Sequence, residues 1–422
     1  MKAITALFLL AGPLSAYTLH EWGTFTTVSG SDGVLLTGLE REEARLPHFA
    51  HSHLGLENGN VSFSNGFGKG VSRPVANVTV KMETPVIYFH SDTAFDAKVK
   101  VGFDGGTISQ WYPERSGGES MPWPTLPEGL TPEQRREKIT VDFAKGWKGS
   151  IEWQARVLSP AESKEAILFK PGETQHWTQP RVPEANVVQV ANGEKEGFLF
   201  YRGIGNFDPG LKITVASDDT LTLANQTGGA IPFIFVYEKQ RGGYTRWKTL
   251  KSGVEAGKAE EVKLADFTVR NSDPVKPDMA DLLGHGEFNE AVYRDMVTGL
   301  KATGLLESEA KAMVETWWTS YFGADGLRVF WVVPEAKTAQ ILPLEVTPAP
   351  EKQVRVIVGR SEVIRPAKEQ QWLTWSKTGN EQQVAQWQQI VNSDRFGMAY
   401  QKRVQGLAAA AESKTASAAA TD

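Results

Sequence analysis

Residues 97–104, with the sequence AKVKVGFD, alternate between apolar and polar side chains. One face of this stretch carries only apolar side chains, those of Ala97, Val99, Val101 and Phe103, and the other face carries lysines. A period of two residues predicts a strand with one buried face and one face in water. Short apolar runs bounded by Gly, Pro, Asn or Asp recur along the chain as TPVIYFHS, SIEWQARVL, GFLFYRG, LKITVAS, TLTLAN, IPFIFVYE, GLRVFWVVP, AQILPLEV and QVRVIVGR. The pattern favours a mainly β protein with an antiparallel β-sandwich core over a doubly wound sheet.

Two helical patterns interrupt this sheet-like sequence. In ESEAKAMVETWWTSYFG, apolar residues recur at steps of three and one, at Ala310, Met313, Val314, Trp317, Trp318 and Tyr321. This spacing predicts one buried face of a helix that Gly323 can end, and NEAVYRDMVTGL predicts a partner helix before it. The helical pair is expected to be inserted into the sandwich or to cap it. A further helix is predicted in NEQQVAQWQQIVNSDRF, so the overall class is α+β.

The expected organisation follows from these changes in pattern. It comprises a signal peptide (1–16), a glycine-rich N-terminal segment with a histidine cluster (17–75), a β-sandwich (76–272), a helical insertion (273–324), strands completing the sheet (325–366), a C-terminal helical segment (367–405) and a disordered tail (406–422).

The first sixteen residues, MKAITALFLLAGPLSA, predict export. Lys2 gives a positive start, Ile4 to Leu10 form a short apolar core, and Ser15-Ala16 offers a cleavage position. This is the pattern of a signal peptide, and the run is too short to span a bilayer. We therefore expect a periplasmic or extracellular protein, with no transmembrane segment in the mature chain.

Composition excludes several chemistries. The chain has no cysteine, which rules out disulfides, a thiol nucleophile and an iron–sulfur cluster. Its 45 Lys and Arg residues against 50 Asp and Glu leave a formal charge of −5 without a basic stripe, so nucleic acid is not expected as a partner. No GxSxG motif is present, and GFGKG lacks the spacing of a phosphate-binding loop.

Three of the seven histidines lie in LPHFAHSH: His48, His51 and His53. If this segment is extended, His51 and His53 project to the same side and can meet one divalent metal ion, with zinc the first choice. His20 and His90 are the nearest further ligands in sequence. Glu21 is the candidate general base, and Glu83 and Asp92 are other acidic groups beside these histidines. The alternative is a polar surface loop, because the spacing matches neither HExxH nor another metal motif.

Tryptophan is the second signal, with 13 in the chain. Trp111, Tyr112, Trp123 and Trp177 stand in loop-like contexts beside polar residues. An exposed aromatic ring there could stack on a sugar, which makes these four residues candidates for substrate binding. The alternative is that they cap the ends of the sandwich.

Three stretches, LHEWGTFTTVSGSDG, METPVIYF and GLRVFWVVP…LPL…VRVIVGR, resemble a family of exported bacterial proteins with an N-terminal HEWGTFT stretch. The resemblance covers most of residues 19–365. It implies a bacterial exported setting, and no activity is assigned to that family, so no catalytic residue is carried over.

Two functional classes remain open, and whether the protein is an enzyme is left undecided between them. The first is a metal-assisted hydrolase acting on an envelope or environmental polymer such as a polysaccharide. The second is a non-catalytic protein that binds a glycan or another partner through exposed tryptophans.

Overall fold

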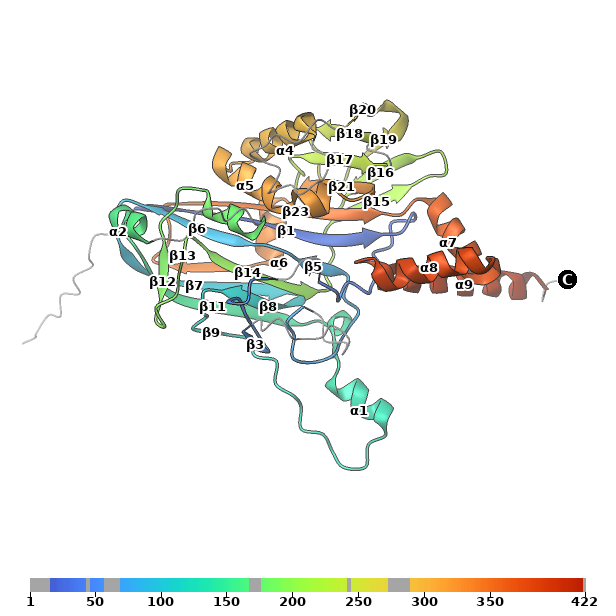
Figure 1. Ribbon diagram of the computed structural model, residues 1–422, viewed down its shortest axis with the longest axis horizontal. Coiled ribbons are helices and arrows are strands. Elements are labelled where there is room, and N and C mark those ends of the chain that lie inside the picture. The colour runs from blue at the N-terminus through green and yellow to red at the C-terminus, as the bar shows by residue number, and fades with distance from the viewer. Residues whose placement is uncertain are drawn as a thin grey trace, which may run out of the picture.

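The computed structural model describes residues 16–42, 46–56, 69–166, 176–240, 244–271 and 289–419 (Figure 1). Strands make up 36% and helices 30% of the chain, so the predicted α+β class with a dominant β content is correct. The predicted signal peptide, apart from Ala16, lies outside the described residues.

Most strands belong to one large mixed sheet. Its strands are β1 (Tyr17–Ser29), β2 (His51–Ser52), β3 (Gly55–Leu56), β5 (Val80–Met82), β6 (Val86–Ser91), β7 (Phe95–Asp104), β8 (Gly106–Tyr112), β9 (Gly117–Gly118), β11 (Lys148–Val157), β12 (Val188–Val190), β13 (Lys195–Glu196), β14 (Leu199–Gly205), β17 (Ile234–Lys239), β18 (Tyr244–Leu250), β20 (Thr268–Asn271), β21 (Gly326–Val332), β22 (Leu344–Thr347) and β23 (Lys352–Val363). Two small sheets are formed by β4 (Val75–Ala76) with β10 (Val141–Asp142) and by β15 (Leu211–Val215), β16 (Thr220–Asn225) and β19 (Ala259–Lys263).

The prediction of an antiparallel sheet is wrong at the centre of the molecule. β1 pairs in parallel with β23, from Thr18 opposite Lys352 to Ser29 opposite Val363, and antiparallel with β6 on its other edge. A parallel pair needs a long crossover, and here residues 30–351 provide it. The sandwich arrangement is not confirmed.

β1 is buried on both faces, which explains why its sequence lacks a period of two. The side chains of Leu19 and Phe25 join the core cluster that contains β7 and β11, whereas Trp22 joins the cluster under the helices. A Cβ atom on Gly23 would lie 2.7 Å from the Cα of Pro85, so only glycine fits at this crossing. The segment predicted as glycine-rich turns therefore begins with the longest strand of the sheet.

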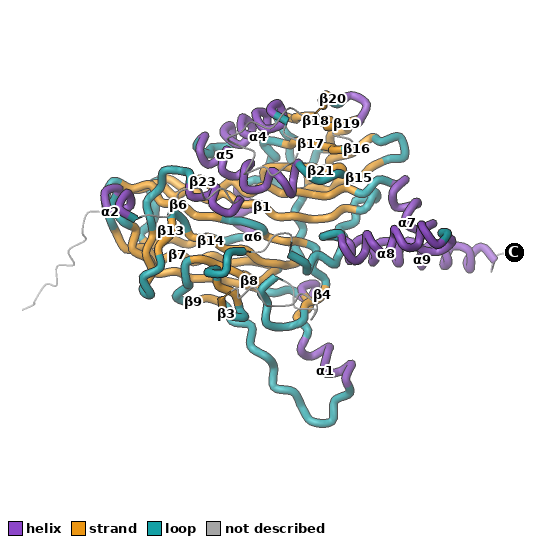
Figure 2. Tube along the Cα trace, viewed as in Figure 1, coloured by secondary structure: helices purple, strands orange, loops and turns teal. Residues whose placement is uncertain are grey.

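Helices α4 (Glu290–Ala302) and α5 (Glu307–Trp317) cover one face of the sheet, beside β1 and β23 (Figure 2). The predicted apolar stripe of α5 is buried, and it continues into a π-helical turn, η5 (Trp318–Phe322). Their shared core contains Val86 and Tyr88 from β6. The predicted helical pair is present, and it packs on the sheet.

Six further helices and three short helical turns complete the described residues. They are α1 (Pro132–Ile139), α2 (Pro160–Glu165), α6 (Glu335–Ile341), α7 (Pro366–Thr378), α8 (Glu381–Ser393) and α9 (Gly397–Ala419), with the short turns η2 (Phe143–Lys145), η3 (His176–Arg181) and η4 (Leu264–Asp266). Helix α1 lies on a segment that projects away from the sheet (Figure 1). The predicted C-terminal helix corresponds to α8. Two expectations differ from the structure: AQILPLEV divides into the end of α6 and strand β22, and residues 406–419 of the expected disordered tail continue α9.

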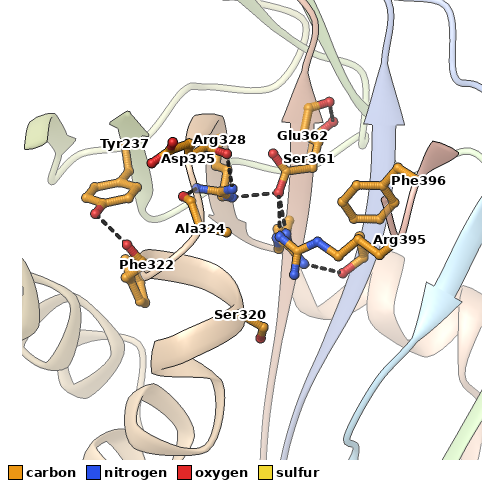
Figure 3. Close-up of polar contacts among 12 residues, drawn as sticks. Tyr237, Ser320, Phe322, Ala324, Asp325, Arg328, Ser361, Glu362, Arg395 and Phe396 are labelled. Carbon is orange, nitrogen blue, oxygen red and sulfur yellow. Dashed lines mark hydrogen bonds and ion pairs between the residues drawn. The ribbon is translucent and has the colours of Figure 1, made fainter. Parts of the chain in front are cut away.

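Charged side chains join the C-terminal helices to the sheet (Figure 3). The carboxylate of Glu362 on β23 accepts a hydrogen bond from Arg328 Nε at 2.5 Å, another from Arg360, and a third from Arg395 NH2 at 3.3 Å. Arg395 lies between α8 and α9, and its guanidinium stacks on Phe396. Burial alone would raise the pKa of Glu362, but the three guanidinium groups outweigh it and lower that pKa.

No helix among the described residues is both long enough and apolar enough to cross a membrane.

Candidate metal centre

Three side chains from distant parts of the chain meet beneath α5. His20 Nδ1 lies 2.8 Å from Glu309 Oε2 and 3.0 Å from Oε1, and His90 Nε2 lies 3.3 Å from Oε1. One nitrogen of each imidazole and one carboxylate oxygen all lie within 4.8 Å of one another. Among the described residues, this is the one group of three His, Cys, Asp or Glu side chains arranged closely enough to hold a metal ion.

The register of the sheet brings the two histidines together. Thr18 on β1 pairs with His90 on β6, and His20 pairs with Tyr88, so the histidines are diagonal neighbours on one face. Side chains in this relation are within contact range, and the two imidazole rings pack edge to face with centroids 4.9 Å apart. The first turn of α5 lies over this face and supplies Glu309.

The environment keeps Glu309 ionised. Burial alone would raise its pKa, but hydrogen bonds from His20 and His90, the Coulombic attraction of His20 and a hydrogen bond from the Leu306 amide lower that pKa to about 2. The Leu306 N–H donates to Oε2 at 2.9 Å. A carboxylate in the first turn of a helix is also stabilised by the positive end of the helix dipole. An ionised, buried carboxylate is the form that a metal ion requires.

The side-chain separations suit a first-row metal. Two ligand atoms, each about 2.1 Å from one zinc ion in tetrahedral geometry, lie about 3.4 Å apart. The separation between His90 Nε2 and Glu309 Oε1 is 3.3 Å, and that between His20 Nδ1 and Glu309 Oε2 is 2.8 Å. A metal ion between them requires a shift of a few tenths of an ångström and would replace the hydrogen bonds from His20 and His90 to the carboxylate.

His90 connects this buried group to a surface cleft of about 670 Å³. Its side chain is 22% exposed, whereas that of Glu309 is fully buried. The cleft is lined by polar groups that include Asp92, Lys164, Glu184 and Asn186. Asp92, one of the acidic groups noted in the sequence, therefore lies in the cleft wall.

The histidines of LPHFAHSH do not converge. His51 Nδ1 lies 2.9 Å from Glu114 Oε2, and its Nε2 lies 2.9 Å from Glu194 Oε1. The two ring nitrogens of His51 thus contact two different carboxylates, and neither contacts another histidine. His53 Nε2 donates to the carbonyl of Ile108 at 2.8 Å, and His48 is exposed. We expected His20 or His90 to approach His51 and His53, and this is not found. Instead, His20 and His90 contact each other.

His53 carries a pH-dependent prediction. Burial, together with the positive charge of Arg115, lowers its pKa from 6.5 to about 4 in the folded protein, against a weaker opposing effect of the hydrogen bond to Ile108. In the unfolded chain His53 takes up a proton near pH 6.5, whereas in the folded chain it does so only near pH 4. The free energy of unfolding therefore falls as the pH is lowered from 6.5 to 4. We expect the free energy of unfolding to fall by about 2–3 kcal/mol from this group. Urea unfolding of wild type and His53→Gln at pH 7 and pH 4.5 measures the effect. Equal pH dependence in the two proteins would contradict it.

Glu21 lies on the opposite face of β1 from His20, because successive strand residues alternate. Its Oε1 accepts from the Tyr201 hydroxyl at 2.6 Å, and its Oε2 pairs with Arg355 Nε at 2.5 Å. The predicted base is thus a buried ion-pair partner that does not reach the histidines. Glu83 forms an ion pair with Lys69, whose Nζ lies 2.9 Å from Glu83 Oε2.

The four aromatic candidates do not form one platform. Trp111 is buried and donates to Glu114 Oε1 at 2.9 Å, whereas Trp123 is 52% exposed near α1. Tyr112 and Trp177 line the same apolar pocket, with Phe49 between them.

Glu309 is the site residue that the sequence pattern missed. It stands next to the apolar stripe of α5, beginning at Ala310, and it is fully buried although ionisable. A glutamate adjoining a core-facing stripe is the signal that would have drawn attention to it. Searches of the sequence against protein-family models and against curated proteins gave no match.

Proposed function

We propose that this protein binds one divalent metal ion, zinc first, through His20, His90 and Glu309, and uses it to hydrolyse a polar polymer. The observation that carries the proposal is the convergence of these three side chains from β1, β6 and α5, of which His90 lines an open cleft.

The donor set supports a catalytic role for the metal. Catalytic zinc sites use three protein ligands and leave a position open, and two histidines with one glutamate are one such set. A metal held in this way supplies a Lewis acid and a water molecule that ionises near neutral pH. The same donors also suit non-haem Fe(II), so metal identity is part of the test.

The cleft supports a polar substrate. Asp92, Lys164, Glu184 and Asn186 provide charged and amide groups along its walls, and His90 brings the metal group to its surface. An open cleft admits a segment of a long chain, as hydrolysis of an envelope or environmental polymer requires. The signal-peptide pattern at residues 1–16 agrees with a substrate outside the cytoplasm.

The test compares metal-loaded and metal-free protein. After zinc loading and dialysis we expect about one zinc ion per chain by mass spectrometry, against a parallel sample loaded with Fe(II) under anaerobic conditions. The loaded protein should release new ends from at least one of a panel of polysaccharides and peptide polymers. Chelation with EDTA should abolish the release and added metal should restore it. Absence of stoichiometric metal after loading would refute the proposal.

Binding without catalysis is the second candidate, and the placement of Tyr112 and Trp177 in one pocket favours it. In that case a glycan ring would stack on these aromatics. The protein would then retain a soluble oligosaccharide in equilibrium dialysis with or without metal, and no polymer would be cut.

A further inference from the structure

A second cavity lies over the other end of α5, away from the metal group. It is lined by apolar side chains from several segments, with Phe49, Tyr112, Trp177, Phe198, Phe200 and Trp317 as its aromatic members. Thr316 and Trp317 lie at the C-terminal end of α5, and Glu309 lies in its first turn. Seven residues of helix separate Glu309 from Thr316, a rise of about 10 Å. Trp22 and Tyr88, both fully buried, belong to the packed core beneath α5, so the two sites are separate.

Phe49, Tyr112 and Trp177 form an aromatic wall of this pocket, and contacts among the rings and with Arg181 hold the wall in place. The rings of Phe49 and Tyr112 have centroids 4.8 Å apart, and those of Phe49 and Trp177 are 5.5 Å apart. The guanidinium of Arg181 packs over Trp177 at 5.1 Å and forms an ion pair with Glu196, whose carboxylate is buried. The wall is therefore held in place before a ligand arrives, which lowers the entropic cost of binding.

The charges at the pocket are already balanced. Glu196 pairs with Arg181 at 2.8 Å, and Arg202 pairs with Glu42 at 2.6 Å. A charged ligand would lose its hydration in this pocket, and Glu196 and Arg202 already form ion pairs within the protein. The pocket therefore favours a neutral ligand.

One buried donor remains for a ligand. Trp317 is 4% exposed and lines the pocket, and its indole N–H has no acceptor among the described residues. Buried polar groups are nearly always hydrogen-bonded, so an orphaned donor beside a cavity indicates a missing acceptor.

We propose that this pocket binds a small neutral ring compound that carries a hydrogen-bond acceptor, with the ring against Phe49, Tyr112 and Trp177 and the acceptor on Trp317. The cavity volume of about 60 Å³ limits the enclosed part to a single ring or a group of similar size. This site is independent of the proposed metal chemistry.

The test uses acetophenone, which has one ring and one carbonyl, and ethylbenzene, which has the ring alone. We expect acetophenone to bind with a Kd of about 1 mM in NMR titrations, as suits so small a ligand. Protein treated with EDTA should bind it equally well, which separates this result from the fate of the metal site. No binding of either probe would overturn the proposal. Preferential binding of benzyltrimethylammonium or benzoate would overturn the neutral-ring assignment.

Two variants locate the site. Ala50 is 2% exposed and lines the pocket, so Ala50→Leu should fill it and abolish binding of both probes. Trp317→Phe keeps a ring and removes the donor, so it should weaken acetophenone about fivefold and leave ethylbenzene unchanged. Equal losses for the two probes would show that Trp317 acts through packing and would overturn its role as donor. If Ala50→Leu does not fold, the Trp317→Phe comparison decides the proposal alone.

Discussion

Glu309→Gln should weaken zinc binding about 100-fold or more, because it removes the anionic ligand and leaves two imidazoles, which hold a divalent ion poorly. The carboxylate is fully buried and contacts both His20 and His90, so no other acidic side chain among the described residues replaces it. Competition with a chromophoric chelator gives the affinity of each variant. His20→Ala and His90→Ala should show losses of the same order.

Two matched controls separate ligand loss from general damage. Glu307 lies two residues away on the same helix, is half exposed and pairs with Lys301 and Lys311, so Glu307→Gln should bind zinc as wild type does. The double variant His51→Ala/His53→Ala should also keep the metal, since neither residue lies in the cluster. If that double variant lost zinc while Glu309→Gln kept it, the metal would bind at His51 and His53, and the proposed site would be wrong.

Glu362→Gln should lower the free energy of unfolding by about 3–5 kcal/mol, the usual effect of removing one partner from a buried ionic group. The neutral amide leaves Arg328, Arg360 and Arg395 facing one another without an anion, and the first two are essentially inaccessible to water. Urea unfolding followed by tryptophan fluorescence and circular dichroism measures the change.

Arg395→Gln is the control for that network. Arg395 is the most exposed of the three cations and its NH2 group is 3.3 Å from the carboxylate, so its loss should lower stability by about 1 kcal/mol. The C-terminal helices should loosen first, which proteolysis after the Lys and Arg residues of α9 would detect. A change below 1 kcal/mol in Glu362→Gln would contradict the stabilising role of the network.

Most strands of the large sheet were predictable from the sequence, including the buried β14, β17, β21 and β23, but β1 was not. The alternation in residues 97–104 gave β7 with its buried face correct, since water on one side imposes a period of two. β1 carries no such pattern because both faces are buried. Its parallel pairing with β23 joins residues more than 300 positions apart, and local pattern contains no information on such a pairing.

The site was predictable in part. His20 and His90, two of the five candidate ligands, lie in the cluster with Glu309. The clustering of three histidines within six positions led to the wrong group of ligands. In the structure His51 contacts the carboxylate of Glu114, whereas His53 contacts the carbonyl of Ile108, so the two imidazoles do not meet. Glu309 lies 289 residues from His20, and only the packing of α5 on the sheet reveals its role.

The pairing of β1 with β23 also determines when the sheet can be completed during synthesis of the chain. β1 is synthesised first, and β6 is available on one edge soon afterwards, but the partner for the other edge, residues 352–363, emerges more than 320 residues later. An unpaired central strand rich in aromatic and β-branched residues is prone to join foreign strands. Contacts of such high sequence separation also slow folding. In a chain with this topology, one edge of β1 stays unpaired until residues 352–363 have been synthesised.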